Sequence, residues 1–157
     1  MTGGGTSIPA VRALLRALAA GRDVAELGTA FGEGAAAMAE TARSVVTVER
    51  DPERAAAARA RLAGFENVAA LEGDCYEVLR GRGPFGLVFA DGGRPLRWEE
   101  ILALVAPGGI LVKDDLTPGR PVEGDDVREF LLRDPRLAAA EILVDPRMAA
   151  IVAVRRG

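Results

Sequence analysis

The sequence predicts a doubly wound α/β fold, in which a mostly parallel sheet of seven strands is covered by helices and ends in an antiparallel hairpin. Three observations predict this fold. Short apolar segments alternate with amphipathic or alanine-rich segments along most of the 157 residues. A glycine-rich loop follows the first apolar segment, and two β-rich segments separated by a turn at 145–147 close the chain.

The first half of the chain predicts three pairs of helix and strand. The first helix places Val11, Leu15 and Leu18 on one face and ends at Gly21. The third helix has an N-cap and a proline at its first position, at 51–52. The expected elements are a helix over 8–20, a strand over 23–27, a helix over 33–41, a strand over 44–49, a helix over 53–63 and a strand over 67–71.

The second half continues the alternation until the final hairpin. Turn signals at 81–84 and 107–109 each precede a predicted strand. The expected elements are a helix over 76–80, a strand over 85–90, a helix over 96–105, a strand over 110–113, a helix over 125–133 and strands over 140–144 and 148–154. We expect residues 1–7 to form a flexible N-terminus and residues 8–157 a single domain, because the chain is too short for two.

The loop after the first strand has the spacing of a cofactor loop. Gly28, Gly32 and Gly34 form the pattern G-x-x-x-G-x-G between a strand and a helix. Glycine permits positive φ and close approach of a ligand to the backbone, and the first N–H groups of the next helix are free to face that ligand. A dinucleotide loop reads G-x-G-x-x-G instead, so the spacing disfavours an NAD-dependent oxidoreductase.

An acidic residue at the end of the second strand strengthens this interpretation. Glu49 lies 21 residues after Gly28, close to the offset of about 20 residues for an acid that binds ribose. A carboxylate there can accept hydrogen bonds from both ribose hydroxyls. The alternative is ordinary turn and cap chemistry, since glycine-rich turns and acids at strand ends are common.

Composition narrows the function classes. The net charge of −3 with no basic run disfavours a nucleic-acid partner, and no apolar run approaches the ~20 residues of a membrane span. The N-terminus lacks the features of a signal peptide and Cys75 is the only cysteine, so we expect a cytoplasmic protein. The absence of histidine excludes Ser-His-Asp and Cys-His catalysis.

Five segments carry a resemblance to a known family. They are Glu26–Gly34, Val48–Glu49, Glu72–Asp74, Val88–Asp91 and Pro107–Asp115. In these segments the chain resembles the class I S-adenosylmethionine-dependent methyltransferases, and within them the O-methyltransferases of the catechol and caffeoyl-CoA type. The resemblance implies the Rossmann-like methyltransferase fold and O-methylation of a small-molecule acceptor. It does not decide whether the protein forms a homodimer. It also leaves open the alternative that the protein binds S-adenosylmethionine without catalysing methyl transfer.

The resemblance also implies a cofactor site. Glu49 would hold the ribose, while Glu26 would orient the glycine loop and the methionine amine. Asp91 would lie nearest the sulfonium. The remaining residues expected to contact the cofactor are those of the loop (Gly28, Thr29, Gly32 and Gly34), the neighbour of Glu49 (Arg50) and the adenine turn (Gly73, Asp74 and Cys75).

A metal and a catalytic pair are implied at the ends of the fourth and fifth strands. By resemblance, Asp91, Asp114 and Asp115 stand at the positions of a metal triad Asp, Asp, Asn, with Asp115 in place of the asparagine, and would hold Mg²⁺ or another divalent cation through their oxygens. The alternative is that Asp114 and Asp115 cap the following loop. Arg94 stands where the family has a lysine that serves as a base. Arginine stays protonated, so the expected catalytic role of Arg94, beside Asp91, is to stabilise an anionic oxygen.

Overall fold

The computed structural model describes residues 7–157 and is built around one seven-stranded sheet. The strand order is β3-β2-β1-β4-β5-β7-β6. The strands are β1 (Asp23–Leu27), β2 (Ser44–Glu49), β3 (Val68–Glu72), β4 (Phe85–Ala90), β5 (Val105–Leu116), β6 (Leu137–Asp145) and β7 (Met148–Arg155). β1 to β5 pair in parallel, whereas β7 is antiparallel to both β5 and β6. The predicted fold class is therefore confirmed.

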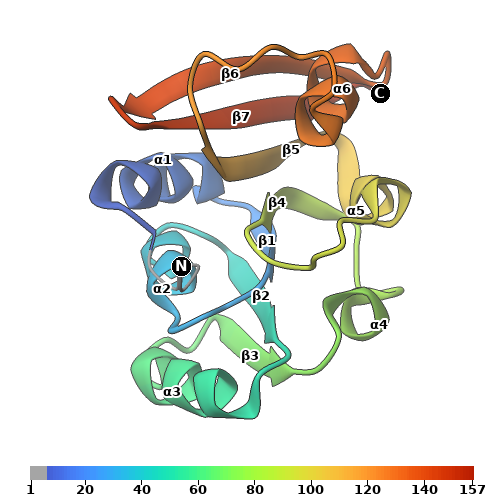
Figure 1. Cartoon of the computed structure of the whole chain (residues 1–157). Coiled ribbons are helices and arrows are strands. Elements are labelled where there is room, and N and C mark those ends of the chain that lie inside the picture. Colours follow the sequence, from blue (N-terminus) through green and yellow to red (C-terminus); the bar gives the residue numbers. More distant parts are fainter. Residues whose placement is uncertain (1–6) are drawn as a thin grey trace.

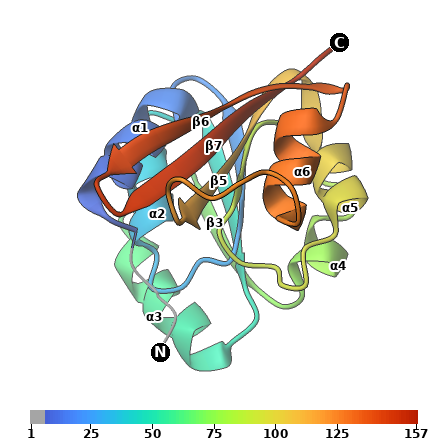
Figure 2. The same cartoon turned by 45° about the horizontal axis from the view of Figure 1, so that its top comes forward.

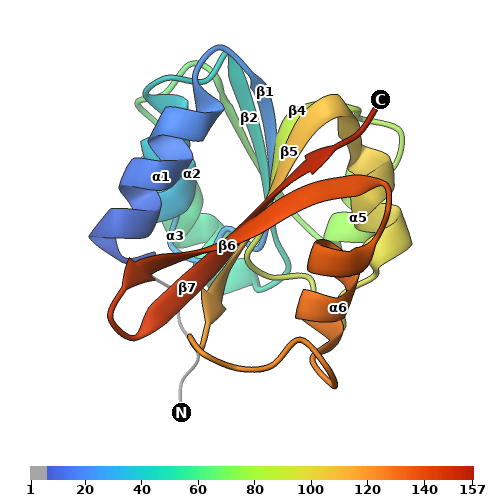
Figure 3. The ribbon, with the colours of Figure 1, turned by 90° about the horizontal axis from the view of Figure 1, so that it is seen from above.

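Three helices cover each face of the sheet, which gives three layers (Figure 1 and Figure 3). The helices are α1 (Pro9–Ala19), α2 (Glu33–Ala39), α3 (Pro52–Leu62), α4 (Cys75–Leu79), α5 (Trp98–Leu104) and α6 (Asp126–Arg133). α1, α2 and α3 lie on one face, and α4, α5 and α6 lie on the other (Figure 2). No helix within residues 7–157 is long and apolar enough to cross a membrane.

Alternate residues of the central strands point to opposite faces and form two cores. Phe89 and Val112 pack with Leu15 and Met38 on the side of α1 and α2. Their strand neighbours, including Val88 and Leu111, pack on the side of α4, α5 and α6. Parallel strands buried on both faces need continuous apolar sequence, which explains why the segment over 85–90 is almost entirely hydrophobic.

The order of the strands fixes where a ligand can bind. β1 pairs with β2 on one side and with β4 on the other. β2 and β3 therefore extend the sheet in one direction from β1, and β4 and β5 extend it in the opposite direction, so the strand order switches between β1 and β4. In doubly wound sheets a ligand binds beyond the carboxyl ends of the strands at such a switch. The loops that follow β1, β2 and β4 therefore frame the candidate site.

The largest differences from the prediction are at β5, which also ends three residues later than expected, at Leu116, and at the start of β6. β5 begins at Val105 and passes through residues 107–109, where we expected a turn. Its pairing with β4 jumps from Phe85–Val105 to Leu87–Ile110, so these residues form an irregularity within the strand. β6 begins at Leu137 because the following alanines pair with β7 although they have no strand pattern of their own. Of the predicted flexible segment 1–7, all but Ser7 lies outside the described residues.

Candidate cofactor and active site

The loops after β1 and β4 meet backbone to backbone at the switch point. Gly28 has φ +89°, and a Cβ atom on it would lie 2.6 Å from the Cα and N atoms of Gly92. The N–H of Gly92 donates a hydrogen bond to the carbonyl of Leu27. Gly28 is thus required by this contact between loops, independently of any ligand. Sequence reasoning missed Gly92, although the pair of glycines directly after Asp91 was a visible signal.

A network of buried polar side chains connects the glycine loop to β1 and β2. Glu26 is 1% exposed and accepts a hydrogen bond of 2.7 Å from Thr47 Oγ1, which lies 2.6 Å from Thr29 Oγ1. A Cβ atom on Gly34 would lie 2.7 Å from Glu26 Oε1. Burial raises the pKa of Glu26 well above its usual value. The structure brings Glu26, Thr29 and Gly34 together, and the Thr29 hydroxyl is engaged by Thr47.

Glu49 is held at the carboxyl end of β2 by two backbone donors. Its Oε2 accepts from the N–H of Ala30 at 2.8 Å, and its Oε1 accepts from the N–H of Asp51 at 3.0 Å. An ionised carboxylate has about four acceptor positions, so both oxygens keep capacity for ribose hydroxyls. These bonds fix the orientation of the side chain before a ligand arrives, and the arrangement fits the ribose-binding role that the resemblance implies.

We predict that Glu49→Ala weakens S-adenosylhomocysteine binding at least about tenfold, because a hydrogen bond to a charged group contributes roughly 1.5–3 kcal/mol. Isothermal titration calorimetry measures this loss. Glu72→Ala is the matched control, since Glu72 pairs with Glu49 at the end of the neighbouring strand but is exposed. An unchanged dissociation constant in a folded Glu49→Ala protein would contradict the assignment.

The predicted adenine turn lies beside Glu49. The N–H of Gly73 donates to the carbonyl of Glu49 at 3.0 Å, which ties the turn after β3 to the end of β2. Asp74 is the N-cap of α4 and accepts from the N–H groups of Tyr76 and Glu77 through Oδ1. Burial raises the pKa of the Cys75 thiol to about 11, so the thiol stays protonated. The cap function of Asp74 accounts for one oxygen and leaves Oδ2 for a ligand.

The loop between β4 and α5 is anchored by Tyr76, which sequence reasoning did not include. The Tyr76 hydroxyl donates to the carbonyl of Gly93 at 2.6 Å and accepts from the N–H of Arg97 at 3.0 Å. The Arg97 guanidinium lies 4.7 Å from the centre of the tyrosine ring. Arg94 lies in this anchored loop and is exposed, as is Arg50 after β2.

The structure brings together two of the three predicted metal ligands. Asp91 and Asp114 lie at the ends of the paired strands β4 and β5, and burial together with the charge of Asp114 raises the pKa of Asp91 to about 7. Asp115 has φ +59° and is exposed. Across residues 7–157 no group of three or more histidine, cysteine or acidic side chains is arranged to hold a metal ion. The side chains as placed therefore do not fit the predicted metal triad.

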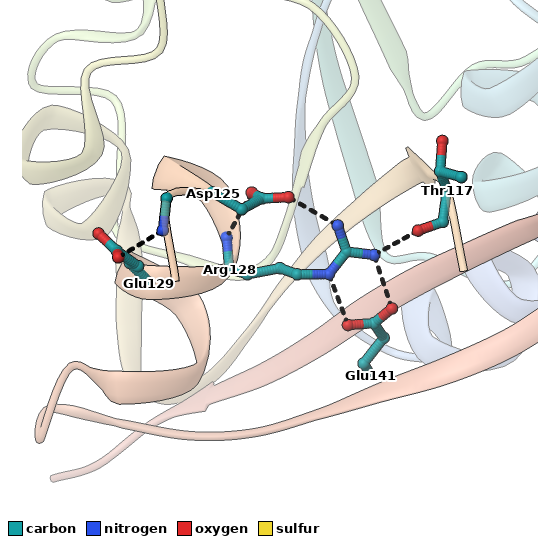
Figure 4. A network of polar contacts seen from close by, with 6 residues as sticks. Thr117, Asp125, Arg128, Glu129 and Glu141 are labelled. Carbon is teal, nitrogen blue, oxygen red and sulfur yellow. Dashed lines mark hydrogen bonds and ion pairs between the residues drawn. The ribbon is translucent and has the colours of Figure 1, made fainter. Parts of the chain in front are cut away.

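A buried arginine fixes the loop after β5 (Figure 4). Arg128 on α6 is 1% exposed and binds Glu141 on β6 through two hydrogen bonds of 2.7 and 2.8 Å. It also binds Asp125 Oδ2 and the carbonyl of Thr117, each at 2.7 Å. The network joins β5, α6 and β6, and so holds the segment 117–125 in one position. Sequence reasoning missed it because Arg128 and Glu141 are adjacent only in the folded chain.

Known proteins resemble the chain in sequence and in fold, although no family model matches it. A protein-L-isoaspartate O-methyltransferase of Rhodopseudomonas palustris is 36% identical over 121 residues, which are 76% of this chain and 52% of that protein. One of Azorhizobium caulinodans is 32% identical over 139 residues, or 87% and 62% of the two chains. An O-methyltransferase from Bacillus cereus, solved in complex with S-adenosylhomocysteine, has a TM-score of 0.77 at 22% identity, covering 98% of this chain and 84% of its own.

The chain has the fold of the class I S-adenosylmethionine-dependent methyltransferases, which confirms the fold that the resemblance in the five sequence segments implied. Within that class the curated relatives are protein-L-isoaspartate O-methyltransferases, whereas the structural neighbour is an O-methyltransferase whose acceptor its name does not give. The chain spans 52–62% of the length of the two relatives, so their substrates do not transfer to it directly.

Proposed function

We propose that the chain binds S-adenosylmethionine and transfers its methyl group to an oxygen nucleophile. The observation that carries this proposal is the convergence of three features at the switch point of the sheet. They are the contact between Gly28 and Gly92, the preoriented carboxylate of Glu49 and the half-buried carboxyl group of Asp91 with its raised pKa. Neither an ordinary turn nor a helix cap requires all three at one end of the sheet.

The residues of the chain act by binding and orientation. Glu49 binds the ribose, Gly73 to Cys75 border the adenine, and the loop from Gly28 to Gly34 supports the methionine portion. The cofactor supplies a methyl group on a sulfonium that an oxygen displaces in line. Asp91 lies beside that positive charge. A nearby cation favours the ionised carboxylate, so cofactor binding should lower the pKa of Asp91 from its raised value.

The acceptor that we propose first is a small molecule with a hydroxyl group, because the family resemblance in the strand ends at Val88–Asp91 and Pro107–Asp115 is to catechol and caffeoyl-CoA enzymes. The exposed Arg94, three residues after Asp91, can stabilise the anionic oxygen. A second candidate is an isoaspartyl carboxylate, which the similarity to protein-L-isoaspartate O-methyltransferases favours.

Methyl transfer from labelled S-adenosylmethionine tests both candidates. The acceptors are a catechol, an isoaspartyl peptide and the same peptide with normal aspartate as a control. Label in the catechol supports the first acceptor. Label only in the isoaspartyl peptide replaces the first with the second. Binding of S-adenosylhomocysteine without transfer to any acceptor would instead support a cofactor-binding protein without catalysis.

A further inference from the structure

The only lysine of the chain is buried at the end of β5. Lys113 is 1% exposed, and the nineteen other basic residues are all arginines. It faces Ile151 of β7 across the sheet ladder. An ammonium group in such a position is strongly unfavourable unless negative charge or hydrogen bonds compensate for the lost water. The surroundings of Lys113 must therefore supply that compensation.

Asp114 provides the first compensating group. Lys113 Nζ donates a hydrogen bond of 2.8 Å to the carbonyl oxygen of Asp114 and lies 4.0 Å from its carboxylate oxygen Oδ1. Asp114 is 4% exposed, and among residues 7–157 its Oδ1 is the one buried side-chain polar atom without a hydrogen-bond partner. A buried carboxylate oxygen of this kind needs a cation, and Lys113 is the basic residue found within ion-pair distance of it.

Asp91 provides the second compensating group for the ammonium of Lys113. Burial lowers the pKa of Lys113, whereas the negative charges of Asp114 and Asp91, and to a smaller extent Asp115, favour its protonated form and Arg94 opposes it. Asp91 directly follows β4, and the pairing of Phe89 with Val112 sets it beside Asp114 near the end of β5, where the charge of Asp114 contributes to the raised pKa of Asp91. Two carboxylates at neighbouring strand ends repel each other unless a positive charge lies with them. A divalent ion placed at the same pair would stand beside the ammonium group and be repelled by it.

We propose that the ammonium group of Lys113 is the counter-ion of the Asp91–Asp114 pair and holds this end of the candidate site in place of a divalent metal. Lys113 is then a positioning residue, which keeps both carboxyl groups oriented toward the site. This proposal rests on the proposed function only in that it calls this region a candidate cofactor site. Its tests measure stability and ion binding, so they can fail or succeed whether or not methyl transfer is observed.

The first test is thermal unfolding of the whole chain with increasing MgCl₂ or CaCl₂ at constant ionic strength, with and without S-adenosylhomocysteine. We expect no saturable rise in Tm with either ion. A saturable rise would overturn the proposal, because it would show that the acid pair still accepts a divalent cation.

The second test removes the ammonium and then the carboxylate that it balances. Lys113→Met should lower the Tm, and Lys113→Met with Asp114→Asn should recover most of the loss, because the second change removes the unbalanced negative charge. Lys113→Met with Asp115→Asn is the matched control and should recover nothing, since Asp115 is exposed. If the single variant does not fold, recovery of a folded protein by Asp114→Asn is the expected result.

Recovery of the Tm in the double variant Lys113→Met with Asp114→Asn distinguishes charge compensation from a packing role of Lys113. If Lys113 only filled space between β5 and β7, the effects of Lys113→Met and Asp114→Asn would add, and the double variant would be less stable than either single one. That result, or the failure to fold of Lys113→Met both alone and combined with Asp114→Asn, would overturn the proposal.

Discussion

Replacing Gly28 with alanine should destabilise the protein by about 3 kcal/mol or more and abolish S-adenosylhomocysteine binding. Two costs combine. The backbone of Gly28 is at φ +89°, a conformation that strains any residue with a Cβ atom. The new methyl group would also lie 2.6 Å from backbone atoms of Gly92, so the loops after β1 and β4 must separate. Thermal unfolding and calorimetric titration measure the two losses.

Gly21→Ala and Gly108→Ala are matched controls for this prediction. Both glycines have positive φ, and a Cβ atom on either would meet nothing within 4 Å. They should cost only the backbone strain, about 1–2 kcal/mol, and leave ligand binding intact. If Gly28→Ala is no worse than these two variants, the contact between Gly28 and Gly92 does not organise the site as we describe.

Arg128→Met should lower the free energy of unfolding by roughly 3 kcal/mol. This is the lower end of the cost of removing one partner from a buried ion pair; we expect the lower end because the Asp125 and Glu141 side chains keep 22% and 24% of their exposure. The two carboxylates and the Thr117 carbonyl would lose their shared donor. Urea unfolding followed by circular dichroism measures the change.

Arg136→Met is the control for Arg128→Met. Arg136 also binds two carboxylates, those of Glu99 and Asp134, but its side chain is 45% exposed. Exposed ion pairs contribute little to stability because water solvates the charges in both states. We expect no clear change in the urea midpoint. Equal destabilisation by the two substitutions would show that burial is not what makes the Arg128 network important.

The fold class could be predicted from the sequence because the local pattern of most segments agrees with the helix or strand that each forms in the folded chain. The helix over 9–19, the strand over 23–27 and the proline-capped helix over 52–62 all lie within one or two residues of their predicted bounds. β5 was predicted too short because its irregular segment at 107–109 contains proline and two glycines, which read as a turn. Only the pairing of β5 with β4 and β7, distant in sequence, keeps that segment in the sheet.

The candidate site was predictable where function depends on spacing along the chain. The distance from Gly28 to Glu49 is such a spacing, and the structure places both at the switch point. The metal prediction assumed that Asp114 and Asp115, adjacent in sequence, reach the same place. The positive φ of Asp115 and the burial of Lys113 arise from the folded surroundings of β5, and no local pattern reports them.

The central claim is that the switch point of the sheet binds S-adenosylmethionine and its product, and not a dinucleotide. Isothermal titration calorimetry of the whole chain with S-adenosylhomocysteine and, separately, with NAD tests it most directly. We predict saturable binding of S-adenosylhomocysteine at one site per chain, weakened at least about tenfold by Glu49→Ala, and no heat of binding with NAD. Tight binding of NAD without any response to S-adenosylhomocysteine would contradict the claim.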